Sequence, residues 1–233
     1  MSHPLLANIV WHALAGPQAA HAAGTDTARR YARGYSPIVG FADPRRPDFD
    51  ALAPHCDVDE HLYCGGWSGP APSGWRIDED TSALQMVWAG SVPGSDDALD
   101  AVRLDAGHVP QMLALVAATQ PGPFGPRTVE LGEYYGVFDG GRLVAMAGER
   151  MEAGALREVS GVCTDPLWQG RGLARRLMLK LVLEQLRRGQ LPFLHVMREN
   201  AHAAGLYERM GFRRRGELPV RVVSRNGPGT ARG

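Results

Sequence analysis

The sequence predicts an α/β (α+β) protein built from strands and helices, with a hairpin and two strand–helix units in its C-terminal half. Two apolar stretches, 134–138 and 142–150, are joined by Asp-Gly-Gly, a strong turn signal for a β-hairpin. A third strand at 155–164 leads through a short loop into a long helix at 170–188. A strand at 193–197 then leads directly into another helix. Hairpins followed by strand–helix units favour helices packed on a sheet.

The helices of this part carry recognisable start and stop signals. The long helix has a broad apolar face, and Gly189 ends it. The helix after it covers 200–210 and begins at Asn200, a residue that favours the N-cap. An earlier helix is predicted at 109–119, where apolar residues recur at helical spacing, and a short strand at 102–104 precedes it.

The two ends of the chain are less regular. Residues 4–15 are apolar but lack the cationic start of a signal peptide, so we expect a short amphipathic helix docked on the protein. The stretch that follows is rich in Gly, Pro and Asp, and only two strands stand out in it, at 61–64 and 83–89. Near the other end, residues 212–224 predict a closing pair of strands around Pro219.

The composition excludes several classes of protein. The chain has 233 residues, of which 44% are hydrophobic, and its 25 basic and 25 acidic side chains cancel. A net charge of zero gives no general affinity for nucleic acid, and no apolar stretch is long enough to cross a membrane. Three unevenly spaced cysteines exclude a disulfide framework or a cysteine-rich zinc module. We therefore expect a cytoplasmic protein that binds no metal, nucleic acid or membrane.

The zero net charge is unevenly distributed along the chain. Residues 1–150 hold 10 basic and 18 acidic side chains, whereas residues 151–233 hold 15 basic and 7 acidic ones. Such an asymmetry favours an anionic ligand for the C-terminal part, with a chance distribution of solvated charges as the alternative.

Glycines at the start of the long helix predict an anion-binding loop. A glycine-rich loop at a helix N-terminus exposes backbone N–H groups, and the helix dipole adds partial positive charge. Gly170 and Gly172 allow close approach of a phosphate, and Arg171, Arg175 and Arg176 add full charges. A phosphate-bearing cofactor is expected. The loop lacks the lysine of a Walker motif and the third glycine of a dinucleotide-binding fingerprint.

Two blocks of sequence carry a family resemblance. Residues 169–174 read Q-G-R-G-L-A, and residues 193–212 read F-L-H-V-M-R-E-N-A-H-A-A-G-L-Y-E-R-M-G-F. They resemble the Q/R-x-x-G-x-G/A motif and the N-x-x-A-x-x-L-Y-E-x-x-G-F block of the GNAT superfamily of acyl-CoA-dependent N-acetyltransferases. The resemblance covers roughly residues 99–224. It implies the GNAT fold, in which a mixed, mostly antiparallel central sheet is flanked by helices and splayed parallel strands hold coenzyme A (CoA).

The sequence also indicates a division of the chain. The segment 92–97 is similar to a linker, so we place a domain boundary there. The expected parts are a smaller N-terminal α/β region at 1–95, the acetyltransferase domain at 96–224 and a flexible tail at 225–233. The N-terminal region is expected to be either a degenerate half-domain of the same fold or a cap over the acceptor site.

The resemblance implies acetyl-CoA as the co-substrate and a set of residues that bind it. Backbone groups at the end of the 155–164 strand would bind the pantetheine arm, and the Val162 N–H would polarise the thioester carbonyl. The loop amides, with Arg171 and Arg175, would hold the pyrophosphate. The full predicted set is Val162, Cys163, Thr164, Gln169, Gly170, Arg171, Gly172, Leu173, Ala174, Arg175 and Asn200.

Three residues are implied or considered for proton transfer. Tyr207 matches the family's general acid, which protonates the leaving thiolate, although a tyrosine packed on the sheet is the alternative. The general base is either Glu158 or His195. The structural alternative for Glu158 is an ion pair with an arginine, and the alternative for His195 is a place in the core. Cys163 is the weakest candidate for a nucleophile, because a buried cysteine on an apolar strand is usually inert.

The acceptor would meet the proline-rich loop before the hairpin and the N-terminal region. Arg127 could hold a substrate carboxylate or tie down its own loop, and Tyr134 and His195 are further candidates. Glu130 and Glu133 could hold an amine or face solvent. The expected function is transfer of an acetyl or longer acyl group to a primary amine of a small molecule or amino-acid-like acceptor. Direct attack in a ternary complex is expected, by a monomer or homodimer. The alternative is a non-catalytic acyl-CoA sensor or partner module of the same fold.

Overall fold

The computed structural model describes residues 3–96, 98 and 100–227, and within them one sheet of eleven strands dominates. The strands are β1 (Ala22–Gly24), β2 (Ala28–Tyr31), β3 (Ile38–Phe41), β4 (Leu62–Gly65), β5 (Trp75–Trp88), β6 (Val102–Arg103), β7 (Tyr134–Asp139), β8 (Arg142–Ala153), β9 (Leu156–Thr164), β10 (Leu191–Met197) and β11 (Phe212–Arg225). The α-helices are α1 (Ile9–Leu14), α2 (Phe49–Leu52), α3 (Val109–Thr119), α4 (Leu173–Arg187) and α5 (Ala201–Met210).

The sheet is mixed and mostly antiparallel, as predicted. Its strand order is β1-β2-β3-β4-β11-β5-β10-β9-β8-β7-β6. Only the β3–β4 and β9–β10 pairs are parallel among the described strands. The predicted hairpin is formed by β7 and β8, whose connection places Gly140 and Gly141 at positive φ, where glycine avoids a steric penalty.

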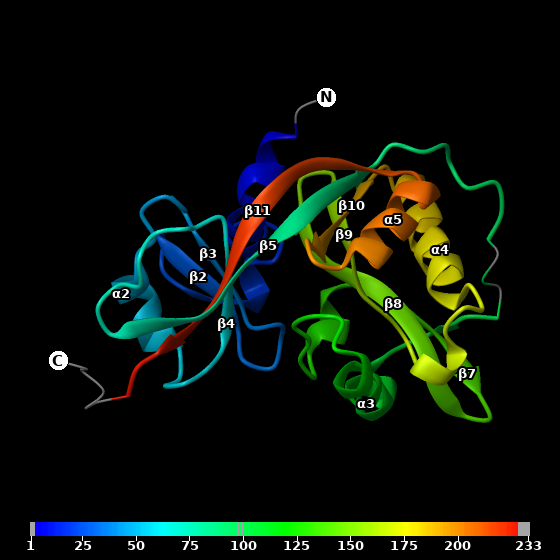
Figure 1. The fold of residues 1–233 in the computed structure, drawn as a ribbon, viewed down its shortest axis with the longest axis horizontal. Coiled ribbons are helices and arrows are strands. Elements are labelled where there is room, and N and C mark those ends of the chain that lie inside the picture. Colours follow the sequence, from blue (N-terminus) through cyan, green and yellow to red (C-terminus); the bar gives the residue numbers. More distant parts are fainter. Residues whose placement is uncertain (1–2, 97, 99, 228–233) are drawn as a thin grey trace.

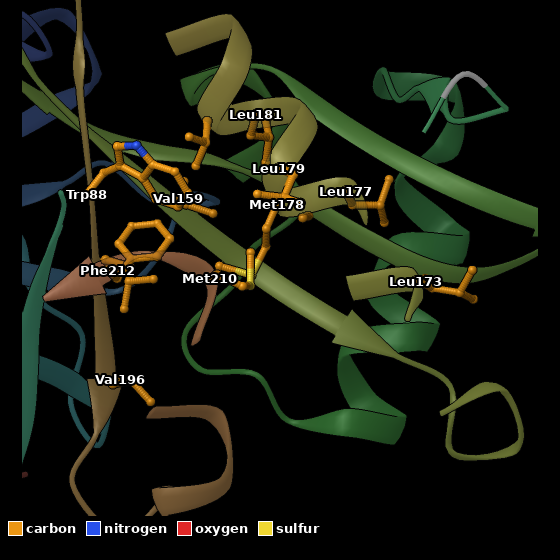
Figure 2. Packing of buried hydrophobic residues seen from close by; sticks show 14 of the residues in the cluster. Trp88, Val159, Leu173, Leu177, Met178, Leu179, Leu181, Val196, Met210 and Phe212 are labelled. Carbon is orange, nitrogen blue, oxygen red and sulfur yellow. The ribbon is translucent and has the colours of Figure 1, made fainter. Parts of the chain in front are cut away.

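Helices pack on both faces of the sheet. On one face α4 and α5 pack against the strands through a cluster that includes Leu177, Val159 and Phe212 (Figure 2). On the other face α1 packs through Ile9 and Leu14, and α3 covers β7, β8 and β9. Neighbouring residues of a strand alternate between these faces, which fits the two-sided burial of a central sheet.

A long antiparallel ribbon of β5 and β11 connects the two ends of the sheet (Figure 1). Strands β1 to β4 lie beyond one side of this ribbon, and β6 to β10 lie beyond the other. The division of the chain into two domains near residue 96 stays a prediction. The sheet itself runs across it, because β5 precedes that position and pairs with β10 and β11, which follow it.

The predicted pair of closing strands at 212–224 is wrong, since β11 is one strand of 14 residues. Proline ends most strands because it has no N–H to donate. The carbonyl of Pro219 accepts a hydrogen bond from Gly66 N–H at 2.9 Å, at the end of β4. The N–H that proline lacks would face the same side, where the β4 ladder stops, so little pairing is lost.

The N-terminal segment forms the expected helical structure, with Leu6, Ile9, Val10, Ala13 and Leu14 buried. Strands β1, β2 and β3 were not predicted from the sequence; they are short and separated by glycine and proline turns. In the predicted tail, Arg225 belongs to β11, and residues 228–233 lie outside the described residues. None of the helices in the described part of the chain combines the length and hydropathy of a membrane span.

Candidate active site

The two parallel strands β9 and β10 separate soon after they begin. They pair only at Leu191–Leu156, Pro192–Arg157 and Phe193–Glu158, although both strands continue. Beyond these pairs β9 keeps its ladder with β8, and β10 keeps its ladder with β5. The edges of β9 and β10 that face each other therefore form an opening in the middle of the sheet. Backbone N–H and C=O groups without ladder partners are available to a ligand there.

A β-bulge lies on β9 at this opening. Met146 and Gly148 of β8 are two residues apart in the sequence, whereas their partners on β9, Cys163 and Ser160, are three residues apart. The extra residue falls at Gly161–Val162, and Gly161 has a φ of +61°, a left-handed conformation that glycine adopts without strain. A bulge leaves one backbone unit outside the ladder, and here that unit lies at Gly161–Val162.

The loop before α4, for which anion binding is predicted, has an open backbone at the helix start. Gly170 and Gly172 both have a φ of +75°, and a Cβ at either would meet nothing within 4 Å, so the loop is open to a ligand. The first α-helical bond runs from Arg176 N–H to the Gly172 carbonyl at 3.1 Å. The N–H groups of Leu173, Ala174 and Arg175 thus have no helical acceptor, which is the usual basis of anion binding at a helix start.

The charged and polar side chains of this loop differ in their freedom. The Arg171 guanidinium lies 4.1 Å from the centroid of the Trp168 ring. Gln169 Nε2 donates to the Thr164 carbonyl at 3.4 Å, so this side chain joins the loop to the end of β9. Arg175 is exposed and makes no ion pair with any described residue, which leaves its charge available.

Helix α5 carries two of the predicted residues. Asn200 is its N-cap, as predicted, because Oδ1 accepts a hydrogen bond from Ala203 N–H at 3.0 Å. Tyr207 packs against the core beside Phe212, with ring centroids 6.2 Å apart, and its hydroxyl bonds no described residue. Burial raises the pKa of Tyr207 to about 12, so its hydroxyl keeps its proton at neutral pH.

Glu158 is buried at the point where β9 and β10 separate. Its two oxygens accept hydrogen bonds from Arg150 Nε and Nη2, both at 2.9 Å, and Met151 N–H adds a third at 3.3 Å. Burial alone would raise the pKa of Glu158, but the Arg150 charge and the hydrogen bonds from His195 and Arg150 outweigh it and lower the pKa to about 2. Such a carboxylate is a weak proton acceptor at neutral pH.

His195 lies between Glu158 and Gln85, and its tautomer follows from its neighbours. Gln85 Nε2 donates to the Leu6 carbonyl at 2.9 Å, so this atom is a nitrogen, and it lies 3.2 Å from His195 Nε2. His195 Nε2 is then the acceptor, and Nδ1–H donates to Glu158 at 2.8 Å. A carboxylate that holds Nδ1–H leaves Nε2 as the basic nitrogen.

Tyr134 lies on the same face of the sheet as His195, which is opposite the face covered by α4 and α5. It is 1% exposed, and its ring stands edge-on to Phe124 at 5.7 Å. Its hydroxyl is buried and has no hydrogen-bond partner among the described residues. Burial raises the pKa of Tyr134, so the hydroxyl remains a neutral donor.

The remaining predicted candidates have structural partners. Arg127 makes two hydrogen bonds to Glu130, at 2.9 and 2.8 Å, and lies 4.5 Å from the centroid of the Tyr35 ring. Glu133 pairs with Arg103. Arg127 and Glu130 therefore neutralise each other. The contact of Arg127 with Tyr35 ties the proline-rich loop to the N-terminal region.

Cys163 is buried on β9 among apolar side chains of α3 and β8. Burial raises the pKa of its thiol to about 12, although a hydrogen bond with Thr119 acts in the opposite direction. A thiol of this kind is not a nucleophile at neutral pH.

The fold thus places Glu158 and His195 where β9 and β10 begin to separate, and the glycine loop beyond the C-terminal end of β9. Sequence reasoning missed Arg150, Gln85 and Gly161. None of the three left a clear signal in the sequence, because their importance depends on contacts between strands. The described residues contain no group of three or more His, Cys, Asp or Glu side chains placed to hold a metal ion.

Comparisons with known proteins agree with this geometry. The profile of the FR47-like protein family matches residues 134–222. A crystal structure of an acetyltransferase from the GNAT family of Novosphingobium aromaticivorans is 39% identical, with a TM-score of 0.86, and the match covers 97% of this chain and 100% of that one.

Two further relatives match less completely. N-alpha-acetyltransferase RimI of Mycobacterium tuberculosis is 37% identical over 86 residues, which are 36% of this chain and 53% of that protein. The match therefore spans only about half of that relative's length. A GCN5-related N-acetyltransferase-like protein of Streptococcus suis shares the fold, with a TM-score of 0.59 at 16% identity over 92% of both chains.

Proposed function

Because this chain belongs to the GNAT family of acetyltransferases, we propose that it transfers an acetyl group from acetyl-CoA to a primary amine of a small molecule or amino-acid-like acceptor. The observation that carries the proposal is the opening between β9 and β10, with the Gly161–Val162 bulge beside it and the glycine loop at its end. The residues present fit acetyl-CoA: unpaired backbone groups suit the pantetheine amides, and the start of α4 suits the pyrophosphate.

The proposed reaction is direct attack of the amine on the thioester in a ternary complex. The Val162 N–H at the bulge donates to the carbonyl oxygen as that oxygen gains negative charge. Tyr207 protonates the departing thiolate, a role that fits a hydroxyl whose proton burial retains.

His195 takes the proton of the amine in this proposal, and Glu158 is its positioning residue. Glu158 already bonds Arg150 and His195, so it orients the imidazole rather than accepting a proton itself. Of the two hydrogen bonds of the His195 ring, the Nε2 contact to Gln85 is the longer, at 3.2 Å against 2.8 Å for Nδ1, and it is the one that an amine or a water would replace.

A thiol-release assay tests the proposed function. Acetyl-CoA is incubated with a panel of free amino acids, short peptides with free α-amines, polyamines and aromatic amines, and released CoA is measured with DTNB. The similarity to an N-alpha-acetyltransferase makes α-amines the first class to try. We expect saturable release with one class and a mass gain of one acetyl group on that acceptor. If CoA raises the melting temperature but no amine releases thiol, the chain is instead an acyl-CoA-binding module.

Replacing Arg175 by Ala should weaken CoA binding several-fold at low salt. Arg175 is the exposed arginine of the first α4 turn, and one charge–phosphate contact is worth about 1 kcal/mol when partly exposed. Salt screens such contacts, so the wild-type affinity should fall as salt rises and the Arg175→Ala affinity should fall less. Titration calorimetry at two salt concentrations measures both effects.

Arg46→Ala is the matched control for this experiment. The Arg46 side chain is 90% exposed, lies in the N-terminal region and pairs with Asp43. Equal losses of affinity in the two variants would show that Arg175 acts only through the overall charge of the protein.

A further inference from the structure

The Tyr134 ring lies across two neighbouring strands, because both carry a glycine beneath it. Tyr134 on β7 pairs with Gly148 on β8, and Gly148 pairs in turn with Ser160 on β9. A Cβ at Gly148 would come within 2.2 Å of the ring, and one at Gly161 within 3.1 Å. These two positions lack side chains where the ring passes, so the tyrosine reaches from β7 to the β9 edge of the opening.

The hydroxyl at the end of this ring has no partner. It lies 3.5 Å from the position that a Cβ of Gly161 would occupy, beside the bulge. No described residue bonds it, although it is fully buried. Buried hydroxyls nearly always bond something, so an unsatisfied one beside a ligand opening points to a group supplied by the ligand.

The surroundings indicate what that group is. The nearby charge of Arg150 disfavours a second cation, and the carboxylate of Glu158 is already taken by Arg150 and His195. We therefore infer that the missing partner of the Tyr134 hydroxyl is a neutral hydrogen-bond acceptor on the ligand. The Val162 N–H, which adjoins the same glycine, is the donor already assigned to the carbonyl oxygen of the thioester.

We propose that the Tyr134 hydroxyl donates a second hydrogen bond to the acyl carbonyl oxygen of bound acyl-CoA, next to the Val162 N–H. The inference rests on the proposed function. Two donors on one oxygen bind the acyl group in the ground state and strengthen as the oxygen gains charge. The glycines at 148 and 161 are then part of the acyl site, because each makes room for the ring.

The test compares acetyl-CoA with S-ethyl-CoA, a thioether that keeps the two-carbon chain and lacks the carbonyl oxygen. Binding of each to wild type and to Tyr134→Phe is measured by titration calorimetry. The wild type should bind acetyl-CoA more tightly than S-ethyl-CoA. In Tyr134→Phe this preference should fall about tenfold, as expected for one lost hydrogen bond, while S-ethyl-CoA affinity changes less than twofold.

Tyr135→Phe is the matched control. Tyr135 is the next residue of β7 and faces the opposite side of the sheet, where its hydroxyl donates to Glu184 at 2.9 Å. This variant should keep the wild-type preference for acetyl-CoA. Tyr134→Phe should also melt no lower than wild type, because it removes a hydroxyl that bonds nothing in the free protein.

The outcomes separate the two proposals. A Tyr134→Phe variant with the wild-type preference, or a wild type without any preference, overturns the role of Tyr134 alone. A wild type that binds neither ligand overturns the proposed function together with this inference. Loss of the preference in Tyr134→Phe but not in Tyr135→Phe supports both.

Discussion

Replacing Glu158 by Ala should lower the free energy of unfolding by about 3–5 kcal/mol, because it leaves the Arg150 guanidinium buried without a counter-charge. Glu158 is 1% exposed and Arg150 is 8% exposed, so water cannot replace the lost partner. The loss is a large share of the stability of an ordinary domain. Urea unfolding followed by circular dichroism at pH 7 measures it.

The same ion pair predicts a pH dependence with a definite sign. Folding lowers the pKa of Glu158 from 4.5 to about 2. A carboxyl with a depressed pKa in the folded state stabilises the protein above pH 4.5. That contribution is lost as the pH falls from about 4.5 to about 2. The difference in stability between wild type and Glu158→Ala should therefore shrink over this range.

Two variants keep this prediction open to contradiction. Glu133→Ala removes a more exposed carboxylate that pairs with Arg103 and should cost at most about 1 kcal/mol. If Glu158→Ala costs no more than Glu133→Ala, the buried pair does not have the assigned importance. Should Glu158→Ala fail to fold, the double variant Arg150→Met with Glu158→Leu should recover folding, because it removes both buried charges.

Replacing Tyr207 by Phe should lower the turnover number about 100-fold while acetyl-CoA affinity changes less than twofold. The phenol is the proposed proton donor to the thiolate, and phenylalanine keeps the ring that packs beside Phe212. The lost hydroxyl bonds no described residue, so the folded structure loses no contact. Steady-state rates with a saturating acceptor, together with calorimetric binding of acetyl-CoA, separate chemistry from binding.

Tyr135→Phe again serves as the control, because it removes a hydroxyl that hydrogen-bonds Glu184 and lies outside the opening. Its turnover should stay close to that of wild type. An unchanged turnover in Tyr207→Phe would show that another group or water protonates the thiolate. Tyr207 would then be only a packing residue of α5.

Local sequence signals predicted much of the acetyltransferase part. The Asp-Gly-Gly turn between two stretches that favour strands specified the β7–β8 hairpin, and Asn200 specified the start of α5. The glycine loop before α4 was predicted from local residues too, since glycine tolerates the positive φ angles found at Gly170 and Gly172. Such features depend on a few neighbouring residues, so they can be read without the fold. The short strands β1 to β3 lack this local signal and were missed.

The composition of the site was decided by tertiary structure. Glu158 and His195 were both candidates for the base. Only the packing of β8 beside β9 places Arg150 on Glu158, and only the pairing of β5 with β10 places Gln85 on His195. The reach of Tyr134 across Gly148 likewise depends on strand register. The sequence by itself determined the glycine-rich helix start and the titratable residues that are proposed to bind phosphate and move protons. Their charge states and partners were set by burial and by contacts between distant strands, since a single sequence does not encode register or desolvation locally.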